Sequence, residues 1–207
     1  RSFAAIENSM LEDHTMRLNP ANIDVEKLNE AIECLTTETF VLNRVGPDQV
    51  EWFANLLQEP RFFRNSGFKK APSVKTLNES LFDEVEMVAW TASGHDMDEP
   101  VGVCAWVGFS GVPYLFFEPI TPTEIGPDVL QELMEPIVHV FFEFTPGKEL
   151  FVYVPKPVDD DLHLMLVENG FDPMEYLPGN NNEEEMGYLL ARATYDAYFN
   201  ADEDALS

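Results

Sequence analysis

The spacing of apolar residues predicts one helix near the N-terminus. Between residues 23 and 35, apolar side chains recur at positions 25, 28, 32 and 35, which is the spacing of one helical face. Asn22 or Asp24 precedes this stripe, and both residue types cap helices. The stripe is narrow, so the helix must lie on its own domain or on a partner. We assign residues 1–38 to an N-terminal extension with this amphipathic helix.

From residue 39 onwards, the pattern is that of a domain in which helices interleave with strands. The run from 101 to 109 is nearly all apolar, as expected of a central strand buried on both faces. We therefore predict an α+β fold over residues 39–195, with a mixed, mostly antiparallel sheet flanked by helices, and an acidic tail over 196–207. Strands are expected at 39–45, 85–92, 101–109, 112–117, 150–154, 171–177 and 186–193, and helices at 47–57, 73–82, 127–144 and 159–169.

The segment from 127 to 144 is the most apolar of the predicted helices. Apolar residues at 129, 133, 137, 140, 141 and 144 form one stripe, and those at 130, 134 and 138 form a second. A helix that is apolar almost all round should be largely buried. Pro136 lies in its middle and should kink or split it, at a cost of roughly 3 kcal/mol if the helix stays whole.

The charge balance excludes some classes of partner. Lys and Arg total 12 whereas Asp and Glu total 38, which gives a formal net charge of −26. Binding to nucleic acid or to an anionic membrane needs a basic face, so we expect neither partner. A protein partner or an assembly, most simply with a basic partner, is the expectation that remains.

Cysteine usage and the first residues favour a reducing interior. Cys34 and Cys104 permit one bridge but no disulfide-dense scaffold. Cys104 lies in an apolar run and should be a buried, inert thiol. No apolar stretch reaches about 20 residues, and Glu7 interrupts the start too early for a signal peptide. We expect a cytoplasmic protein, or one within a macromolecular assembly, that is neither secreted nor membrane-spanning.

Polar clusters elsewhere predict structure rather than chemistry. His95 and the acids after it lack the EF-hand spacing and should form a solvated loop. The acids at 159–161, near His163, should start a helix, where negative charge is favourable. His139 lies on an apolar helix and should be a hydrogen-bonded core or edge histidine. No metal site is expected. The five basic residues within 61–75 should pair with carboxylates, or else bind an acidic surface or phosphate.

Several local motifs occur along the predicted domain. They are Thr39-Phe-Val-Leu-Asn-Arg-Val45 with the helix start Gly-Pro-Asp-Gln, the P-x-G strand of 99–106, the helix of 162–171 that ends in E-N-G-F, and the strand–loop–strand to Arg192. With the order of elements, these motifs resemble the GNAT superfamily of N-acetyltransferases. The resemblance covers residues 39–193, roughly three quarters of the chain, and implies a GNAT-like sheet.

The resemblance implies acetyl-CoA as the cofactor. Its diphosphate would lie on backbone N–H groups where a helix starts, in a loop of the form R/Q-x-x-G-x-G/A. Here the matching stretch is 121–128, and Ile125, Gly126 and Asp128 would contact the cofactor if acetyl-CoA binds. Only Gly126 fits the pattern. Two prolines remove N–H donors, and each of two carboxylates would cost on the order of 3 kcal/mol at about 5 Å from a phosphate charge. We therefore expect no cofactor.

Two further positions depart from the motifs of active relatives. Leu166 stands where many relatives have the tyrosine that protonates the leaving thiolate. Pro155-Lys156-Pro157 stands where many have an asparagine. Tyr153 or Glu143 could replace the missing acid, although structural roles are the expectation for both. We assign no catalytic residue from the sequence.

Two functional hypotheses follow. In the first, a GNAT-like protein has lost acetyl-CoA chemistry and serves as a structural or protein-interaction component, for example of a virion or another assembly. In the second, the chain is an active N-acyltransferase that moves an acetyl group from acetyl-CoA to a basic amine, such as a lysine or an amino sugar. A third, an acidic mimic of DNA, rests on the net charge alone.

Overall fold

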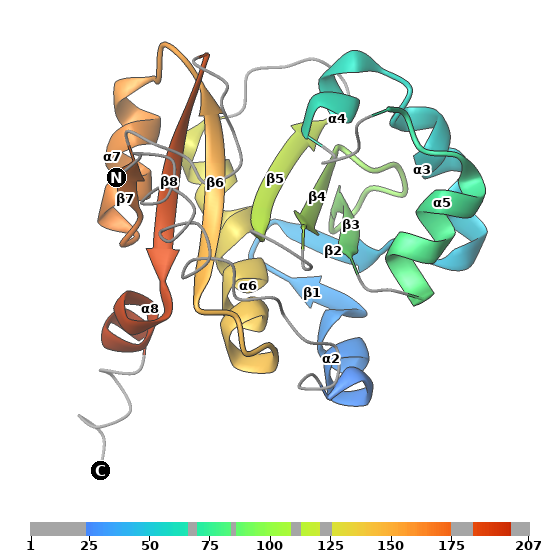
Figure 1. Cartoon of the computed structure of the whole chain (residues 1–207), viewed down its shortest axis with the longest axis horizontal. Coiled ribbons are helices and arrows are strands. Elements are labelled where there is room, and N and C mark those ends of the chain that lie inside the picture. The colour runs from blue at the N-terminus through green and yellow to red at the C-terminus, as the bar shows by residue number, and fades with distance from the viewer. Residues whose placement is uncertain are drawn as a thin grey trace, which may run out of the picture.

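A single mixed sheet organises the chain (Figure 1). The computed structural model describes residues 24–65, 70–83, 86–108, 113–120, 126–174 and 184–199. Within these ranges the sheet has eight strands in the order β1-β2-β3-β4-β5-β6-β8-β7. The strands are β1 (Cys34–Thr36), β2 (Phe40–Arg44), β3 (Met87–Gly94), β4 (Gly102–Val107), β5 (Tyr114–Pro119), β6 (Glu149–Pro155), β7 (Asp172–Met174) and β8 (Glu185–Ala191).

All neighbouring strands pair antiparallel except β5 and β6, which pair parallel. The mixed, mostly antiparallel α+β sheet that the sequence predicts is confirmed. The helices are α2 (Val25–Ile32), α3 (Val50–Leu56) after a 3-10 turn (Pro47–Gln49), α4 (Pro60–Asn65), α5 (Val74–Asn78) continued by a π-helical turn (Glu79–Asp83), α6 (Pro127–Phe144), α7 (Asp160–Glu168) and α8 (Arg192–Phe199).

Alternate residues of the central strands enter two separate cores, one on each face of the sheet. Trp90, Cys104 and Trp106 belong to the core beneath α2, α6 and α7. Ala89 and Ala105 belong to the core beneath α3 and α5. The rings of Trp90 and Trp106 meet edge to face, with centroids 4.9 Å apart. Because successive strand residues point to opposite faces, a strand buried on both faces must be apolar throughout, as β4 is.

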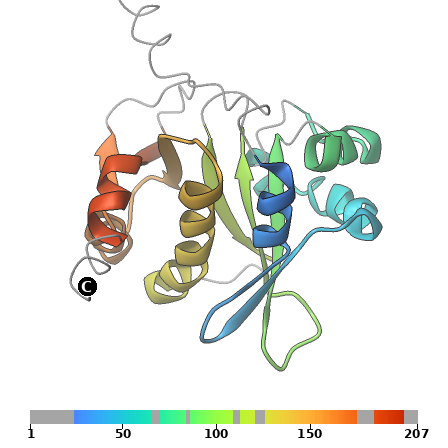
Figure 2. The same ribbon diagram turned by 90° about the horizontal axis from the view of Figure 1, so that it is seen from below.

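Helix α6 connects β5 to β6 and lies beside α2 on one face of the sheet (Figure 2). Leu133, Ile137 and Phe141 of α6 are buried. The helix is not split at Pro136 but continues to Phe144. Burial of the flanking turns offsets the cost of roughly 3 kcal/mol that an interior proline brings. Among the described residues, no helix is long and apolar enough to cross a membrane.

The described part of the expected N-terminal extension packs on the core beneath α6. Asp24 caps α2, because its carboxylate accepts a hydrogen bond of 3.2 Å from a first-turn N–H. The Ile32 carbonyl accepts a hydrogen bond of 2.8 Å from the Trp90 indole. The helix ends at Ile32 rather than at 35, since residues 34–36 pair with β2 as an edge strand. Residues 1–23 of the expected extension lie outside the described residues.

Helix α7 begins and ends where its sequence indicates. The Asp159 carboxylate accepts hydrogen bonds of 3.0 and 3.1 Å from two backbone N–H groups of the first turn. Gly170 follows the helix with a φ of +82°, a conformation that favours glycine over any other residue. Both ends of this helix are therefore fixed by local chemistry.

The last described segment differs from the prediction. We expected a strand over 186–193, but β8 ends at Ala191 and α8 follows directly. Tyr195 of α8 is buried against the core beneath α6, and this contact outweighs the strand-like pattern. Helix α8 runs to Phe199, into the segment assigned to the acidic tail.

Candidate functional site

The sheet opens between its two parallel neighbours, β5 and β6 (Figure 1). Among the described residues, register pairs join only Tyr114 with Phe151 and Leu115 with Val152. Strand β5 pairs along its whole length with β4, and β6 pairs along its whole length with β8. Each strand is thus held by its outer neighbour while the two diverge. The later residues of both strands border a split in the sheet.

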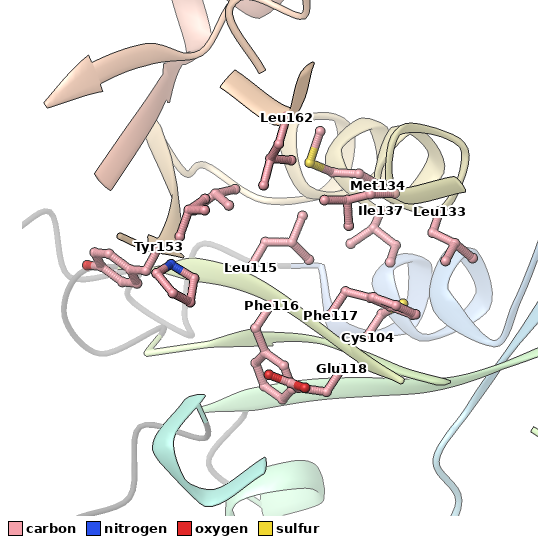
Figure 3. A pocket seen from close by; sticks show the side chains of 14 residues that line it. Cys104, Leu115, Phe116, Phe117, Glu118, Leu133, Met134, Ile137, Tyr153 and Leu162 are labelled. Carbon is pink, nitrogen blue, oxygen red and sulfur yellow. The ribbon is translucent and has the colours of Figure 1, made fainter. Parts of the chain in front are cut away.

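A cavity of about 190 Å³ lies at this split, beneath α6 (Figure 3). Its wall is mainly apolar and comes from β4, β5, β6, α6 and α7. Figure 3 shows Met134 of α6 and Leu162 of α7 next to each other on the helical side. The lining residues are Cys104, Leu115, Phe116, Phe117, Glu118, Leu130, Leu133, Met134, Ile137, Val152, Tyr153, Val154, Pro155 and Leu162.

Two polar side chains in this lining can take part in proton transfer. Glu118 comes from β5 and Tyr153 from β6, and both are half-buried. Burial, with a smaller contribution from Glu185, raises the pKa of Tyr153 to about 12. The phenol therefore keeps its proton at neutral pH. The Tyr114 ring meets the Tyr153 ring edge to face at 5.1 Å, and burial raises the pKa of Tyr114 as well.

The start of α6 holds two of the three cofactor-contacting residues predicted from the sequence. Gly126 is the N-cap, and Asp128 is exposed in the first turn. Ile125 lies outside the described residues. Among the described residues, no atom lies within 4 Å of a Cβ atom added to Gly126. The positive end of α6 favours an anion there, but Pro127 lacks an N–H and Asp128 brings negative charge.

The described residues therefore suit the thioester end of an acyl-CoA better than its diphosphate end. The apolar cavity and the polar pair Glu118 and Tyr153 suit a thioester and its arm. The start of α6 offers a diphosphate fewer N–H donors and an opposing carboxylate.

Of the two candidate substitutes for the missing acid, only Tyr153 lies at the cavity. Glu143 accepts a hydrogen bond of 3.2 Å from the hydroxyl of Tyr195, which also lies 2.6 Å from Nδ1 of His139. His139 is thus hydrogen-bonded, as the sequence predicts. Leu166, which replaces the tyrosine of many relatives, is fully buried in the core.

Arg61 anchors the end of β5. Its guanidinium donates hydrogen bonds to the backbone carbonyls of Pro119 and Ile120 and lies 3.2 Å from a carboxylate oxygen of Glu59. The guanidinium carbon also lies 4.2 Å from the centre of the Phe62 ring. One member of the basic segment thereby fixes the strand that carries Glu118.

The remaining polar candidates have structural partners. Nε2 of His95 lies 3.0 Å from the carbonyl oxygen of Thr37, and Nδ1 of His163 lies 2.8 Å from the hydroxyl of Tyr188. Cys34 is an exposed free thiol. Cys104 is a buried free thiol, and its burial confirms the prediction from the sequence. The described residues contain no group of three or more His, Cys, Asp or Glu side chains that could hold a metal ion.

Glu118 is the functional candidate that sequence reasoning missed. It follows the apolar strand Tyr114–Phe117 directly, and a charged residue that ends a buried strand was the available signal. Its position at the split depends on the parallel pairing of β5 with β6, which no local pattern indicates.

No protein-family model and no curated protein matches this sequence. Solved acetyltransferase structures nevertheless resemble it. An acetyltransferase from Agrobacterium tumefaciens strain C58 aligns with a TM-score of 0.54 and 17% identity, over 76% of this chain and 93% of that one. FdhC, a nucleotide-linked sugar GNAT, aligns with a TM-score of 0.52 and 14% identity, over 83% and 96%.

A third structure contains a bound coenzyme. AAC(6')-Ib in complex with ribostamycin and coenzyme A aligns with a TM-score of 0.53 and 12% identity, over 78% of this chain and 98% of that one. The expectation of no cofactor finds no support in these comparisons. At such identities the likeness concerns the fold: this chain has a divergent form of the GNAT acetyltransferase fold.

Proposed function

We propose that this chain is an amine N-acyltransferase that takes its acyl group from a coenzyme A thioester. The observation that carries the proposal is the split between β5 and β6, which opens onto a cavity lined by Glu118 and Tyr153. A concave site with apolar walls and a few convergent polar groups is typical of a ligand site.

In this proposal, an acyl-CoA supplies a thioester carbonyl, whose carbon gains a C–N bond from the amine while its C–S bond breaks. Glu118 accepts the proton that the attacking amine loses. Tyr153 donates a hydrogen bond to the departing sulfur. Its pKa of about 12 exceeds the value of about 8.5 for an ordinary thiol, so the phenol keeps its own proton and water protonates the thiolate.

The acceptor that fits this site best is a basic amine. Glu118 lies in the lining, and Glu185 is close enough to Tyr153 to raise the pKa of its phenol. The chain as a whole carries a formal charge of −26, which attracts cations. An ordinary alkyl amine has a pKa of about 10.4 and must lose a proton before it attacks, which gives Glu118 its role.

The test combines binding with turnover. Calorimetry with acetyl-CoA should give a micromolar Kd, and mass spectrometry should detect acylated spermidine or an acylated lysine peptide. Glu118→Gln should lower kcat about 10²- to 10⁴-fold with little change in KM. Glu143→Gln is the matched control, because Glu143 lies outside the cavity. Absence of binding at millimolar acetyl-CoA together with absence of turnover would refute the proposal.

A second candidate function, favoured by the start of α6, keeps the fold without the chemistry. Pro127 and Asp128 disfavour a diphosphate at that helix end, and Leu166 replaces an acid of active relatives. The chain would then be an interaction component of an assembly with a basic partner. Deletion of residues 1–23, which leaves α2 and β1 in place, should abolish assembly measured by size exclusion if this is the function.

A further inference from the structure

The outer side of α7 leaves apolar side chains exposed. Leu164 is 53% exposed and Val167 is 39% exposed, and the two lie three residues apart on one side of the helix. The opposite side of α7 carries Met165 and Leu166, which are buried in the core beneath α6. The helix therefore packs on its own fold with one side and keeps a second apolar strip at the surface.

Tyr198 of α8 extends this strip and is 60% exposed. A Cβ atom added to Gly170 would lie 3.7 Å from Cδ2 of Tyr198, and the N–H of Gly170 donates a hydrogen bond of 3.0 Å to the carbonyl of Val167. Figure 1 shows α7 and α8 at the same end of the sheet, beside β7 and β8. We call Leu164, Val167 and Tyr198 the α7 surface. Single exposed apolar side chains are common, but a contiguous group with a polar rim is typical of an interface.

The charged side chains next to the α7 surface are almost all acidic. Arg192 is the only lysine or arginine among the described residues of α7, β7, β8 and α8. Its guanidinium donates hydrogen bonds of 2.8 and 2.7 Å to the carbonyls of Gly147 and Thr145, so it is engaged within the fold. His163 lies 2.8 Å from the hydroxyl of Tyr188. The exposed carboxylates of these elements are Asp160, Asp161, Glu168, Asp172 and Asp196.

The position of Glu168 is not explained by the chemistry of its own helix. Asp160 and Asp161 lie in the first turn of α7, where the positive end of the helix stabilises acids. Glu168 lies in the last turn, where the negative end disfavours an acid, and that turn contains no basic residue. A cation supplied by a partner would stabilise Glu168.

Helix α8 is held in place beside α7 by contacts with α6. Tyr195 is buried, and its ring stacks on that of Phe142 with centroids 4.7 Å apart. Its hydroxyl lies 2.6 Å from Nδ1 of His139. Tyr198 lies one turn further along the same helix. Because this part of the surface is already ordered, a partner that binds it loses less free energy to ordering.

Charge decides which occupant fits the α7 surface. A second copy of this chain would bring like charges together, and nucleic acid or an anionic membrane would do the same. A cationic protein segment instead meets complementary charge. Leu164 and Val167 form a ridge along a helix, and the apolar face of a second helix packs against such a ridge with side chains at spacings of three and four residues.

We infer that the α7 surface docks a basic amphipathic helix of a partner protein. Its apolar face covers Leu164, Val167 and Tyr198, and its flanking lysines and arginines meet the carboxylates of the rim. The inference is independent of the proposed acyl transfer, because none of these three residues lines the cavity at the split. It also names the surface that the basic partner of the second candidate function would occupy.

The first experiment uses synthetic peptides as probes. A fluorescent peptide of leucine, alanine and lysine, about 18 residues or five turns long, carries its leucines on one helical face. A second peptide has the same composition but spreads the leucines around the helix, and a third has glutamate in place of lysine. Fluorescence anisotropy should show a Kd about 10-fold lower for the first peptide than for the second, and no binding of the third. Equal binding of the first two would reveal ionic attraction only and overturn the inference.

Substitutions in the protein locate the bound peptide. Leu164→Ser combined with Val167→Ser should weaken binding of the first peptide about 10-fold. Glu168→Gln should weaken it about threefold at low salt and less at high salt. Val74→Ser is the matched control, because Val74 is 47% exposed but lies on α5. Tyr198→Ser tests the same surface from α8 if the double variant does not fold. An unchanged Kd in the α7 variants, or equal losses in the control, would contradict the assignment.

Two measurements separate the remaining occupants and the proposed function. Sedimentation should show no self-association that the double α7 variant abolishes; such a dimer would make a second copy the occupant and overturn the inference. Calorimetry with acetyl-CoA is run on the same proteins. A protein that binds the helical peptide but no acetyl-CoA would refute acyl transfer and support this inference, whereas binding of acetyl-CoA without the peptide would do the reverse.

Discussion

Gly102 begins β4 beside the ring of Phe117, and an alanine at this position tests how tightly the β5 wall of the split is packed. A Cβ atom at 102 would lie 2.5 Å from Cζ and 2.6 Å from Cε2 of Phe117, and 3.2 Å from the carbonyl oxygen of Glu118. Carbon atoms pack at about 3.5–4.0 Å, so the tip of the ring must move by about 1 Å. The cavity that Phe117 lines is the space available for that movement.

The expected loss of stability is the difference between two effects. Overpacking costs about 1–3 kcal/mol, while replacing a strand glycine by alanine gains about 0.5–1 kcal/mol. Gly102→Ala should therefore lower the free energy of unfolding in urea by about 1–2 kcal/mol. Phe117→Leu removes the colliding atoms, and in that background Gly102→Ala should instead stabilise the protein by up to about 1 kcal/mol.

The double-mutant cycle gives a sharp criterion. The two substitutions should couple by about 2 kcal/mol, because each acts on the same contact. The packing argument would be refuted if Gly102→Ala had the same effect in both backgrounds. A ring pushed into the cavity should also weaken the binding of acetyl-CoA.

The remaining predictions concern charge and hydrogen bonding. Arg61→Met removes the side chain that donates hydrogen bonds to two carbonyls at the end of β5, and it should lower the free energy of unfolding in urea by about 2–4 kcal/mol. Arg61→Lys should recover little of this loss. A loss of less than about 1 kcal/mol in Arg61→Met would contradict the anchoring role. A hydrogen bond from Thr37 lowers the pKa of Glu132 in the folded protein. The Glu132 carboxylate should therefore stabilise the fold at pH values above its unfolded pKa of about 4.3. This stabilisation should vanish as the pH falls through the lowered pKa of the folded state. Glu132→Gln should therefore unfold with a shallower dependence on pH in acid, and an unchanged acid profile would count against the bond. Asp128→Asn removes negative charge from the start of α6 and should tighten coenzyme A binding up to about fivefold at low salt and less at high salt; an unchanged Kd would place the diphosphate elsewhere.

Much of the fold follows from local patterns in the sequence. The 18 residues of α6 were predicted with both ends, because Pro127 starts the helix and its apolar residues keep helical spacing. The ends of α7 follow from Asp159 and Gly170 in the same way. Helix α4 was not among the predicted helices, although it begins at Pro60 and proline is well suited to the first turn of a helix.

Elements that depend on distant contacts were not predictable in this way. Strand β1 has only three residues, Cys34–Thr36, and is a strand because β2 lies beside it. Helix α8 follows β8 because Tyr195 reaches the core beneath α6.

The candidate site likewise contains some residues that were named from the sequence and others that only distant contacts bring together. Gly126 and Asp128 were named only because the stretch 121–128 matches the diphosphate loop of the family that the sequence resembles, and the structure places both at the start of α6. Tyr153 was named only as a substitute acid, and its place in the lining depends on the divergence of β5 from β6. Glu118 and the cavity arise from that divergence too, because two strands and two helices must meet to form the wall.

Hydrogen exchange measured with and without an acyl-CoA tests the central claim most directly, because it reports where on the chain the ligand lies. With saturating acetyl-CoA, backbone amides of 116–118 and 153–154 should exchange more slowly, as should those of the first turn of α6. Amides of α2 and α5, outside the cavity, should exchange at their original rates. Unchanged exchange at 116–118 and 153–154 in the presence of bound ligand would contradict the assignment of the split as the acyl-CoA site.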